Sequence, residues 1–504
     1  MDTTKKKLIS RRAFCKNLTI GTVGFATLAG TGYTRLSSGA SLSDGTTKKI
    51  PFNLPRRAIG NTGMYVSVLG LGAGSRFWNN SHLPRELWED YVHRALAVEG
   101  INYIDTAINY GSNQESEKML GTIVQCYRND LILSSKTPQR HYDGVMRDIE
   151  TSLTNLKTDY LDVYLMHNLG QNGSETSLRQ LENGYNAILK LKEQGVVKAI
   201  GFSSHSAVPQ LVSQAVDHLD IDLLLLSTNN RFNYKPHIES IADRGVAVST
   251  IKVMMPIEGQ NPSQTGKTLL RGVLDLPVCS AVITHRTQDV FDSNLTTIRE
   301  YAAEQGIDMY YADFSAQSQI NDFTFIPSQT NFQLQQDKQR SVLSLKTVGP
   351  LYSNPRRPRT YALVNNKIWK EAEVTINVRY TDTLGTPDII IPFAYQDEHH
   401  WCYAHISNRA DNFHNVIMKV DGSNRYTIHT ERTRSPLQTK EYYRIKLVFN
   451  ADKGSVCVYC DDDGMQEPFL VASNATFAPG LVGLGSFDTL ALFDNLEIHG
   501  KVTT

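Results

Sequence analysis

The sequence predicts two domains of different fold class, a (β/α)8 or TIM barrel followed by an all-β sandwich. In the first half, eight apolar strand-like runs alternate with amphipathic stretches long enough for helices, and such alternation over about 250 residues is typical of a parallel barrel. After about residue 318 the helical periodicity stops, and short alternating runs separated by Gly, Asp and Asn follow, which indicates two packed β-sheets. We therefore expect a barrel over residues 55–315 and a jelly-roll sandwich over residues 316–504.

The first forty residues differ in composition from the rest of the chain and resemble a twin-arginine export signal. A lysine cluster at residues 5–7 precedes the pair Arg11–Arg12, and a weakly apolar run rich in Gly and Thr follows. That run is shorter and more polar than a membrane-spanning helix of about 20 apolar residues. We expect a signal peptide at residues 1–40, a linker at residues 41–54, contact with the twin-arginine translocation machinery, and a periplasmic or otherwise exported protein. The alternative is a basic, disordered N-terminus.

The composition argues against several classes of function. The 51 basic and 51 acidic residues balance, and no basic stripe occurs beyond the N-terminus, so nucleic-acid binding is not expected. No segment after the signal is apolar enough for a stable membrane span. The six cysteines are scattered, and Cys457 and Cys460 lie in an alternating run where positions three apart point to opposite faces. We expect no metal site.

Each barrel strand is predicted from a short apolar run that precedes a helical stretch. The runs are apolar on both faces, as expected for parallel strands covered by helices. The helical stretches include RELWEDYVHRALAVEG and LRQLENGYNAILKLKEQG, which both end in Gly, the residue most typical of a helix C-terminus. The eight runs cover residues 66–72, 101–107, 131–136, 161–167, 197–204, 221–227, 246–254 and 280–285.

Four polar residues lie at or just after the ends of consecutive barrel runs: Asp105, Tyr110, Lys136 and His167. The strand ends of a parallel barrel converge on one face, so these side chains are expected to meet in one pocket. The phenol of Tyr110 can donate a proton to a developing alkoxide, and Lys136 can lower the pKa of that phenol from about 10 toward neutrality. Asp105 neutralises and positions the lysine, and His167 orients the carbonyl oxygen. Each residue alone is more typical of a barrel rim or core, but together they predict carbonyl reduction.

These residues resemble the motifs of the aldo/keto reductase family over roughly residues 55–315. AIGNTGMYVSVLGLGAG is similar to the family's opening strand, and QESEKMLG to the helix after its catalytic tyrosine. IGFSSHS is similar to the fifth strand, and SAVITHRTQDVFDSNL to the eighth strand and helix. The resemblance implies an NADP or NAD cofactor and carries the four catalytic roles to the residues named above.

The same resemblance implies cofactor-binding positions. Ser203 and Ser204 match the pair that holds the nicotinamide carboxamide, and Asn229 matches an asparagine found in many members. In the segment after the eighth strand, Asn294 aligns with the family, and Arg286 can partly substitute for the arginine that grips an adenosine phosphate.

Two departures from the family leave the choice between NAD and NADP open. Leu225 stands where a glutamine is often found, and Val290 stands where the phosphate-binding arginine is common. For the substrate, Phe77 and Trp78 in the first loop are expected to stack on a sugar or another apolar face; the alternative is an anchor packed on the barrel rim. Lys252 ends the seventh run and can face cofactor or substrate.

The C-terminal half resembles concanavalin A-like and laminin G-like β-sandwiches and the 3-keto-disaccharide hydrolase domain. The similarity lies in FAYQDEHHWCYAHIS, in YYRIKLVFN with GSVCVYCDDDG, and in the ending GLVGLGSF…LFDNLEIHG. It implies a carbohydrate-binding-like accessory module, since no carboxylate pair spaced as in a retaining glycosidase is apparent. His399, His400 and Trp401 form a cluster that can meet a glycan or mark an exposed strand start, and Asp494 and Asn495 are typical of turn or sheet-edge residues.

We therefore expect an exported NAD(P)-dependent oxidoreductase that moves hydride between its cofactor and a carbonyl or alcohol, on a small-molecule or glycan substrate. Because free cofactor is scarce outside the inner membrane, we expect the dinucleotide to be retained through many turnovers. One alternative is a redox-neutral enzyme that cleaves a glycoside through a keto-sugar intermediate, which needs a base beyond the four residues. The other is a non-enzymatic glycan-binding protein.

Overall fold

The computed structural model describes residues 48–79, 85–170, 175–205, 209–228, 235–254, 262–338, 340–349, 357–365, 367–381, 386–461 and 467–503. Its contacts divide the chain into two compact units, one built on Arg56–Thr297 and the other on Ile298–Thr504 together with Phe52–Pro55. The predicted signal at residues 1–40 lies outside the described residues. No helix of the described ranges is long and apolar enough to cross a membrane.

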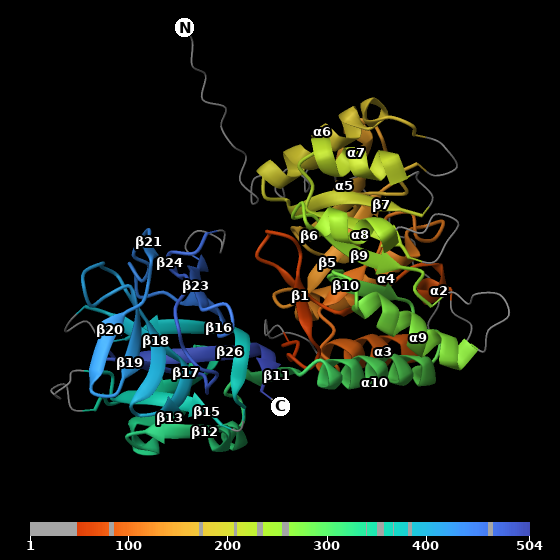
Figure 1. Ribbon diagram of the computed structural model, residues 1–504. Coiled ribbons are helices and arrows are strands. Elements are labelled where there is room, and N and C mark those ends of the chain that lie inside the picture. The colour runs from red at the N-terminus through yellow and green to blue at the C-terminus, as the bar shows by residue number, and fades with distance from the viewer. Residues whose placement is uncertain are drawn as a thin grey trace, which may run out of the picture. The chain divides into compact units, whose positions relative to one another are not determined.

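The first unit is a closed parallel barrel whose strands occupy the eight predicted runs (Figure 1). Each strand pairs in parallel with the next along the chain, and the last pairs with the first through Ala281 and Leu69. The prediction of a (β/α)8 barrel is therefore confirmed. The strands are β3 (Leu69–Gly72), β4 (Tyr103–Asp105), β5 (Ile132–Thr137), β6 (Leu161–Met166), β7 (Val197–Ser204), β8 (Leu223–Ser227), β9 (Ala247–Ile251) and β10 (Ser280–Ile283).

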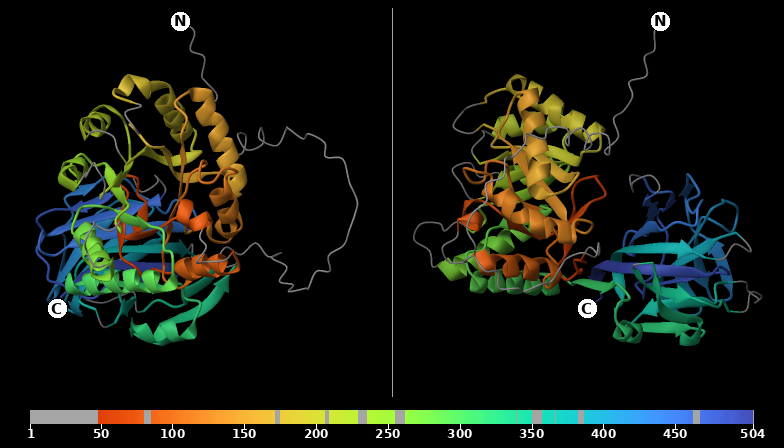
Figure 2. Two further views of the ribbon diagram at one scale, coloured as in Figure 1. Left: turned by 90° about the vertical axis from the view of Figure 1, so that its right-hand side faces the viewer. Right: turned by 180° about the vertical axis from the view of Figure 1, so that it is seen from behind.

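Helices cover the outside of this barrel, as the three ribbon views agree (Figures 1 and 2). Helix α5 shows why, because its buried residues Val145, Ile149, Leu153 and Leu156 recur three and four apart and form one apolar face. The helices are α2 (Ser75–Trp78), α3 (Arg85–Ala97), α4 (Glu115–Tyr127), α5 (Tyr142–Leu156), α6 (Glu182–Glu193), α7 (Pro209–His218), α8 (Lys235–Ala242), α9 (Pro262–Leu274) and α10 (Gln288–Glu304), with the 3-10 turn η2 at Leu178–Gln180.

The segment expected to be one opening strand is instead a hairpin followed by the first barrel strand. Strands β1 (Arg56–Ala58) and β2 (Tyr65–Ser67) form the hairpin, and Arg57 donates to the carbonyls of Leu274 at 2.8 Å and Val278 at 2.8 Å. These carbonyls precede β10, so the hairpin lies at the end where the strands begin. The residues at the ends of the strands therefore lie at the opposite end of the barrel from the hairpin.

The second unit consists of two mainly antiparallel sheets. One contains β11 (Ile307–Ala312), β13 (Phe332–Asp337), β14 (Arg340–Leu345), β16 (Trp369–Tyr380), β21 (Glu431–Arg432), β22 (Tyr443–Asn450), β23 (Ser455–Cys460), β24 (Leu470–Ala472) and β26 (Ala491–Val502). The other contains β12 (Phe323–Ile326), β15 (Thr360–Val364), β17 (Asp388–Asp397), β18 (His400–Ser407), β19 (Val416–Asp421), β20 (Asn424–Thr427) and β25 (Gly483–Ser486), and 3-10 turns η3 (Gln317–Asp322) and η4 (Gln329–Asn331) precede β12 and β13.

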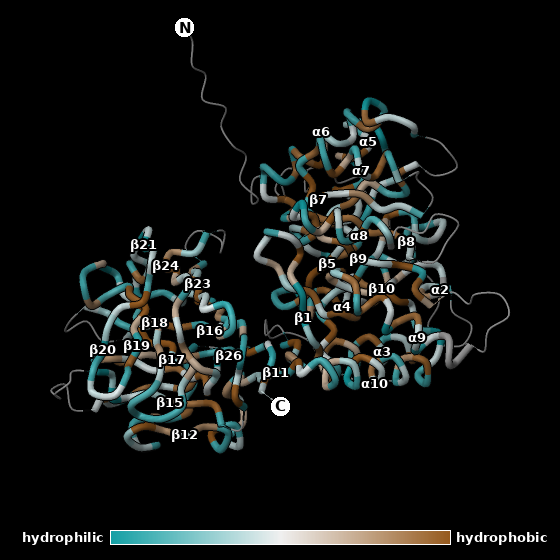
Figure 3. Tube along the Cα trace, viewed as in Figure 1, coloured by the Kyte–Doolittle hydropathy of each residue, from teal (hydrophilic) through white to brown (hydrophobic). Residues whose placement is uncertain are grey.

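A single large apolar core is shared by the two sheets. Val374 and Ile376 of β16 and Ile391 and Phe393 of β17 belong to it, and the ring of Phe393 lies 5.3 Å from that of Phe449 on β22. The apolar stretches of the chain coincide with these strands and with the barrel strands (Figure 3). An all-β C-terminal domain is thus confirmed, whereas its jelly-roll and concanavalin A-like type stays a prediction.

The domain boundary differs from the expected one at residue 315. Strand β11 pairs with β26 from Ile307 opposite Lys501 to Ala312 opposite Leu496, so it belongs to the sandwich. Its position directly after α10 gave it the local appearance of the barrel's last segment, but its hydrogen-bonding partner lies almost 190 residues away. Strand β11 therefore belongs to the second unit, and the division between the two units falls at Thr297–Ile298, within α10.

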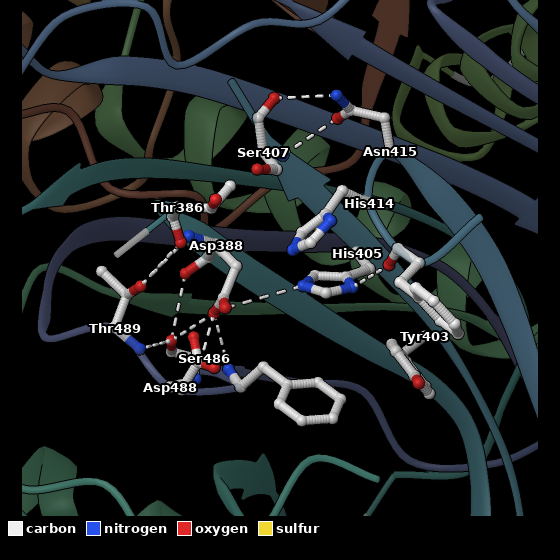
Figure 4. A network of polar contacts seen from close by, with 12 residues as sticks. Thr386, Asp388, Tyr403, His405, Ser407, His414, Asn415, Ser486, Asp488 and Thr489 are labelled. Atoms are coloured by element: carbon white, nitrogen blue, oxygen red, sulfur yellow. Dashed lines mark hydrogen bonds and ion pairs between the residues drawn. The ribbon is translucent and has the colours of Figure 1, made fainter. Parts of the chain in front are cut away.

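A buried polar network ties β17 to β18 and to the end of β25 (Figure 4). The Oδ1 atom of Asp388 accepts from Ser486 Oγ at 2.7 Å and from the backbone N–H of Phe487 at 2.8 Å. Its Oδ2 atom lies 3.8 Å from His405 Nε2. The Nδ1 atom of His405 lies 2.6 Å from the carbonyl oxygen of Phe413, so that it donates this hydrogen bond. The network holds an acid and a histidine in the buried part of this sheet.

Candidate active site

Backbone hydrogen bonds beyond the barrel strands align the chain segments that carry the four predicted residues. The N–H of Ala73 donates to Asp105 O at 2.8 Å, and the N–H of Ile108 donates to Lys136 O at 3.2 Å. The N–H of His167 donates to Thr137 O at 2.8 Å. The ladder therefore continues past the strands and fixes the starting points of the loops on this face.

Lys136 lies at the centre of the site, with its side chain fully buried. Its Nζ atom donates to Asp105 Oδ2 at 2.7 Å and to Thr106 O at 2.7 Å. The third donor points at the hydroxyl oxygen of Tyr110, 3.2 Å away. Since an ammonium has three N–H groups, this lysine is held by three partners, and Ser134 Oγ in turn donates to Asp105 Oδ1 at 3.0 Å.

The charges of this cluster follow from burial and from the lysine. Burial lowers the pKa of Lys136, but Asp105 and Tyr110 outweigh it, so that the pKa is raised and the group stays an ammonium at neutral pH. Burial raises the pKa of Tyr110, and Lys136 opposes this rise without cancelling it. The expected fall of that pKa toward neutrality is not found in this cluster, because burial disfavours a phenolate and the carboxylate beside the lysine adds to that effect. Tyr110 is a protonated phenol and hence a donor.

His167 lies next to Tyr110, with the two ring centroids 5.5 Å apart at an interplanar angle of 77°. Burial, followed by the charge of Lys136, lowers the pKa of His167 to about 2. The imidazole is therefore neutral across the physiological range. Its Nδ1 atom lies 2.9 Å from Oδ1 of Asn109, a residue that the sequence did not single out.

The structure thus brings together Asp105, Tyr110, Lys136 and His167 on one face of the barrel. A neutral phenol held against a buried ammonium can protonate an alkoxide, and a neutral imidazole beside it can hydrogen-bond the same oxygen. The arrangement can therefore serve a carbonyl–alcohol interconversion without requiring a charge on the histidine.

The two serines at the end of β7 are buried and partly engaged by the neighbouring loop. Ser203 Oγ accepts from the N–H of Asn168 at 3.0 Å, and Ser204 Oγ donates to Leu169 O at 2.8 Å. A hydroxyl group can both donate and accept, as a carboxamide can, so the two groups are chemically compatible.

The remaining predicted cofactor-binding residues differ in their burial, and one of them lies outside the described residues. Asn229 lies outside the described residues, and Arg286 is exposed just after β10. Asn294 on α10 is only 2% exposed, and its Nδ2 donor has no hydrogen-bond partner within the described residues. The same holds for the buried hydroxyls of Ser227 and Thr228 at the end of β8. Buried polar atoms without a partner at these positions fit the polar groups of a nucleotide.

The two aromatic residues proposed for the substrate differ in their surroundings. Phe77 is 5% exposed and packs edge-on against Trp88 of α3, with ring centroids 5.4 Å apart. This packing favours the alternative for Phe77, an anchor of the loop in the core, over stacking on a substrate. Trp78 is half-buried. The preceding Gly74 brings this loop to the catalytic tyrosine, since a Cβ there would lie 4.0 Å from the Tyr110 ring.

Three further residues lie in or directly after the barrel strands β7, β8 and β9. Leu225, expected at a family glutamine position, is buried in the apolar interior of the barrel. Lys252 is exposed at the end of β9, with a left-handed backbone φ of 58°. His205, which follows Ser204 and was not singled out from the sequence, is half-buried, and burial together with the charges of Lys252 and Lys136 lowers its pKa to about 4. Its signal was its position directly after a predicted strand-end serine.

The described residues contain no group of three or more His, Cys, Asp or Glu side chains arranged for a metal ion. Cys457 and Cys460 lie on opposite faces of β23, as predicted, and they form no disulfide with each other. In the sandwich, β18 begins at His400, which is exposed together with His399, whereas Trp401 is 2% exposed and packs in an apolar cluster. Asp494 forms an ion pair with Arg340 at 2.8 Å.

Residues 68–255 match the model of the Aldo/keto reductase family. The chain therefore carries an aldo/keto reductase family domain in this range, and this family implies an NAD(P)-dependent oxidoreductase.

Individual relatives match part of the chain. The Uncharacterized oxidoreductase YqkF of Bacillus subtilis (strain 168) is 26% identical over 230 residues, which are 41% of this chain and 70% of that protein. L-galactose dehydrogenase of Arabidopsis thaliana is 34% identical over 160 residues, 29% of this chain and 47% of that protein, so this match spans about half of the relative. Among solved structures, a putative aldo-keto reductase from Pseudomonas aeruginosa is 25% identical, with a TM-score of 0.42 over 50% of this chain and 98% of that one.

Proposed function

We propose that the protein is an exported NAD(P)-dependent oxidoreductase of the aldo/keto reductase type that interconverts a carbonyl and an alcohol. The observation that carries this proposal is the contact of 3.2 Å between Lys136 Nζ and the hydroxyl of Tyr110, with Asp105 Oδ2 2.7 Å from the same Nζ atom. Such a cluster places a proton donor and a buried positive charge at one point.

When bound, the nicotinamide ring supplies or accepts the hydride. Tyr110 delivers a proton from its hydroxyl to the substrate oxygen as negative charge develops there. Lys136 stabilises the phenolate that this transfer leaves behind, because its Nζ atom is already hydrogen-bonded to that oxygen. His167, neutral and next to Tyr110, orients the same substrate oxygen. Ser203 and Ser204 hold the carboxamide, and Asn294 with Arg286 contacts the adenosine half.

The choice between NADP and NAD depends on the segment after β10. Arg286 is exposed there and can reach a 2′-phosphate, which supports NADP. Val290, also exposed, offers no charge at the position where the family often has arginine, which supports NAD. The proposal therefore covers both cofactors. They differ in the 2′-phosphate, which only NADP carries.

We propose a carbohydrate or glycoside as the substrate class. The name of the relative L-galactose dehydrogenase refers to a sugar, and an all-β second unit is compatible with the carbohydrate-binding-like module that the sequence resemblance implies. In this proposal the sandwich binds a glycan and the barrel oxidises or reduces it. The fold by itself is compatible with other ligands, so the substrate class depends on direct measurement.

The test is the nucleotide content of the mature protein, purified without residues 1–40 and then denatured. Stoichiometric NAD or NADP in the released fraction, identified by absorbance and mass, supports an oxidoreductase with a retained cofactor. If no nucleotide is released, and added NADH or NADPH neither binds nor quenches the protein fluorescence, the oxidoreductase proposal is wrong. Glycan binding measured on the full-length Tyr110→Phe variant then tests the accessory role separately.

A further inference from the structure

His167 has a side-chain contact outside the four-residue cluster. Asn109 lies in the loop between β4 and α4, next to Tyr110, and its Oδ1 atom is 2.9 Å from His167 Nδ1. The side chain of Asn109 is exposed, whereas His167 is almost fully buried. An exposed loop residue therefore contacts the Nδ1 atom of a buried imidazole.

The backbone of His167 is held without any help from Asn109. Its N–H donates to Thr137 O at 2.8 Å, and its carbonyl oxygen accepts from Arg140 Nη2 at 2.8 Å. Arg140 is itself fixed by Glu175, whose Oε1 lies 2.6 Å from Arg140 Nε. With the main chain fixed, the remaining freedom of His167 is the rotation of its ring and the nitrogen that carries the proton.

A neutral imidazole carries one proton, on either Nδ1 or Nε2, and the partner of one nitrogen decides the state of the other. Where an amide oxygen faces Nδ1, the proton is on Nδ1 and Nε2 presents a lone pair. Where an amide NH₂ faces Nδ1, the proton is on Nε2, which then donates. A carboxamide presents both groups, and a half-turn about its Cβ–Cγ bond exchanges them.

We propose that Asn109 is a positioning residue that sets the tautomer of His167, and that its carboxamide allows both tautomers. This inference rests on the proposed carbonyl–alcohol chemistry. A bound carbonyl oxygen requires a donor at Nε2, whereas a bound alcohol can donate its own hydroxyl to a lone pair there. A carboxamide serves both substrates, but a carboxylate, which only accepts, would hold Nδ1 protonated and leave Nε2 without a proton to donate.

The test compares Asn109→Asp and Asn109→Leu with Asn113→Asp as the matched control. Asn113 lies in the same loop and is exposed, and its side chain accepts from Lys118 rather than from His167. The first readout is the ¹⁵N chemical shifts of the His167 ring nitrogens in the purified protein, which report the tautomer and need no substrate. The second is kcat and KM for reduction of a carbonyl by the loaded enzyme.

We expect Asn109→Asp to hold the Nδ1-protonated tautomer and to lower kcat for carbonyl reduction on the order of 10²-fold, the usual effect of losing one donor to a developing oxyanion. Asn109→Leu should give a mixture of tautomers and a smaller loss of kcat, with unchanged cofactor affinity in both variants. Asn113→Asp should change neither readout. Unchanged ¹⁵N shifts in both Asn109 variants overturn the inference. If the wild type binds no nucleotide, the proposed function fails, while the shifts still decide the role of Asn109.

Discussion

The ammonium of Lys136 donates to Asp105 at 2.7 Å, with both side chains shut off from solvent at the end of the barrel. The pair lies under the hydroxyl of Tyr110, so that one buried positive charge contacts both a carboxylate and a phenol. A buried ion pair contributes little net stability because desolvation offsets the attraction. Its value here is the fixed charge that it places beside the proton donor.

The variant Tyr110→Phe removes the proposed proton donor and little else. We expect kcat to fall by about 10²- to 10⁴-fold, the usual contribution of a general acid, while NADPH or NADH still binds. Steady-state kinetics and quenching of protein fluorescence measure the two effects. Tyr142→Phe is the matched control, because Tyr142 is an exposed tyrosine of α5. Undiminished turnover by Tyr110→Phe would falsify the assigned role.

The variant Asp105→Asn leaves the ammonium of Lys136 buried without its anionic partner. We expect a loss of about 3–5 kcal/mol in the free energy of unfolding, as for other buried pairs broken on one side. Adding Lys136→Met should recover part of this loss, because the unpaired charge is then gone. Urea unfolding of the wild type, of Asp105→Asn and of the double variant with Lys136→Met measures the three free energies. Glu193→Gln, which breaks the exposed pair with Lys190, should cost much less, and equal losses in the two single variants would contradict the prediction.

The barrel should lose stability in mild acid. Burial lowers the pKa of His167 to about 2 and that of His285 to about 3, whereas both bind a proton near pH 6.5 when unfolded. A lowered folded pKa means that the stability is present above about pH 6.5 and is lost as the pH falls below it. Each histidine then costs about 1.4 kcal/mol per pH unit.

Hydrogen exchange of barrel peptides between about pH 7 and pH 5, corrected for the intrinsic rate, measures this loss. His285→Gln should reduce the slope, because one of the histidines that bind a proton only on unfolding is then removed. His218→Gln, at an exposed position of α7, should keep the slope of the wild type. If stability depends on pH with the same slope in the wild type, in His285→Gln and in His218→Gln, His285 does not contribute to the acid sensitivity.

The sandwich should respond to acid at a lower pH. Burial raises the pKa of Asp388, but the contact with His405 and the hydroxyl of Ser486 outweigh it and hold the pKa below the usual range of a carboxyl. A lowered carboxyl pKa contributes stability above about pH 4 that is lost as the pH falls further. Asp388→Asn should therefore weaken β17 and β25 at neutral pH and remove this acid dependence. Hydrogen exchange of peptides from β17 and β25 measures the loss of stability. Asp421→Asn, at an exposed position, is the control.

Two glycines provide a contrast in packing. A Cβ at Gly201 in β7 would lie 1.8 Å from the carbonyl oxygen of Leu223 in β8, whereas a Cβ at Gly272 in α9 would meet nothing within 4 Å. We expect Gly201→Ala to cost about 3 kcal/mol, since a backbone oxygen in a barrel cannot move aside. Gly272→Ala should stabilise the barrel by about 0.5–1 kcal/mol, the helix propensity of alanine over glycine. Thermal unfolding followed by circular dichroism compares them.

The sequence alone was sufficient to predict the barrel. Its strands are short apolar runs, and each pairs with the next run along the chain, so that local pattern and order together define the sheet. The four candidate catalytic residues could be found for the same reason, because strand ends meet on one face whatever the side chains between them.

Other features depend on partners that are distant in the chain or on packing. Strand β11 looked like part of the barrel until its pairing with β26 placed it in the sandwich. Phe77 looked like a substrate contact, but it packs against Trp88. Asn109 carries no sequence signal of its own, and its contact with His167 exists because two loops meet.

The sequence by itself determined the order of the elements, the closed parallel barrel and the candidate catalytic set, because these follow from hydrophobic period and from chain order. Only the tertiary structure decided the protonation states. Tyr110 keeps its proton and His167 stays neutral because loss of water around each group disfavours its charged form. Desolvation depends on everything that surrounds a group, and no local pattern contains that information.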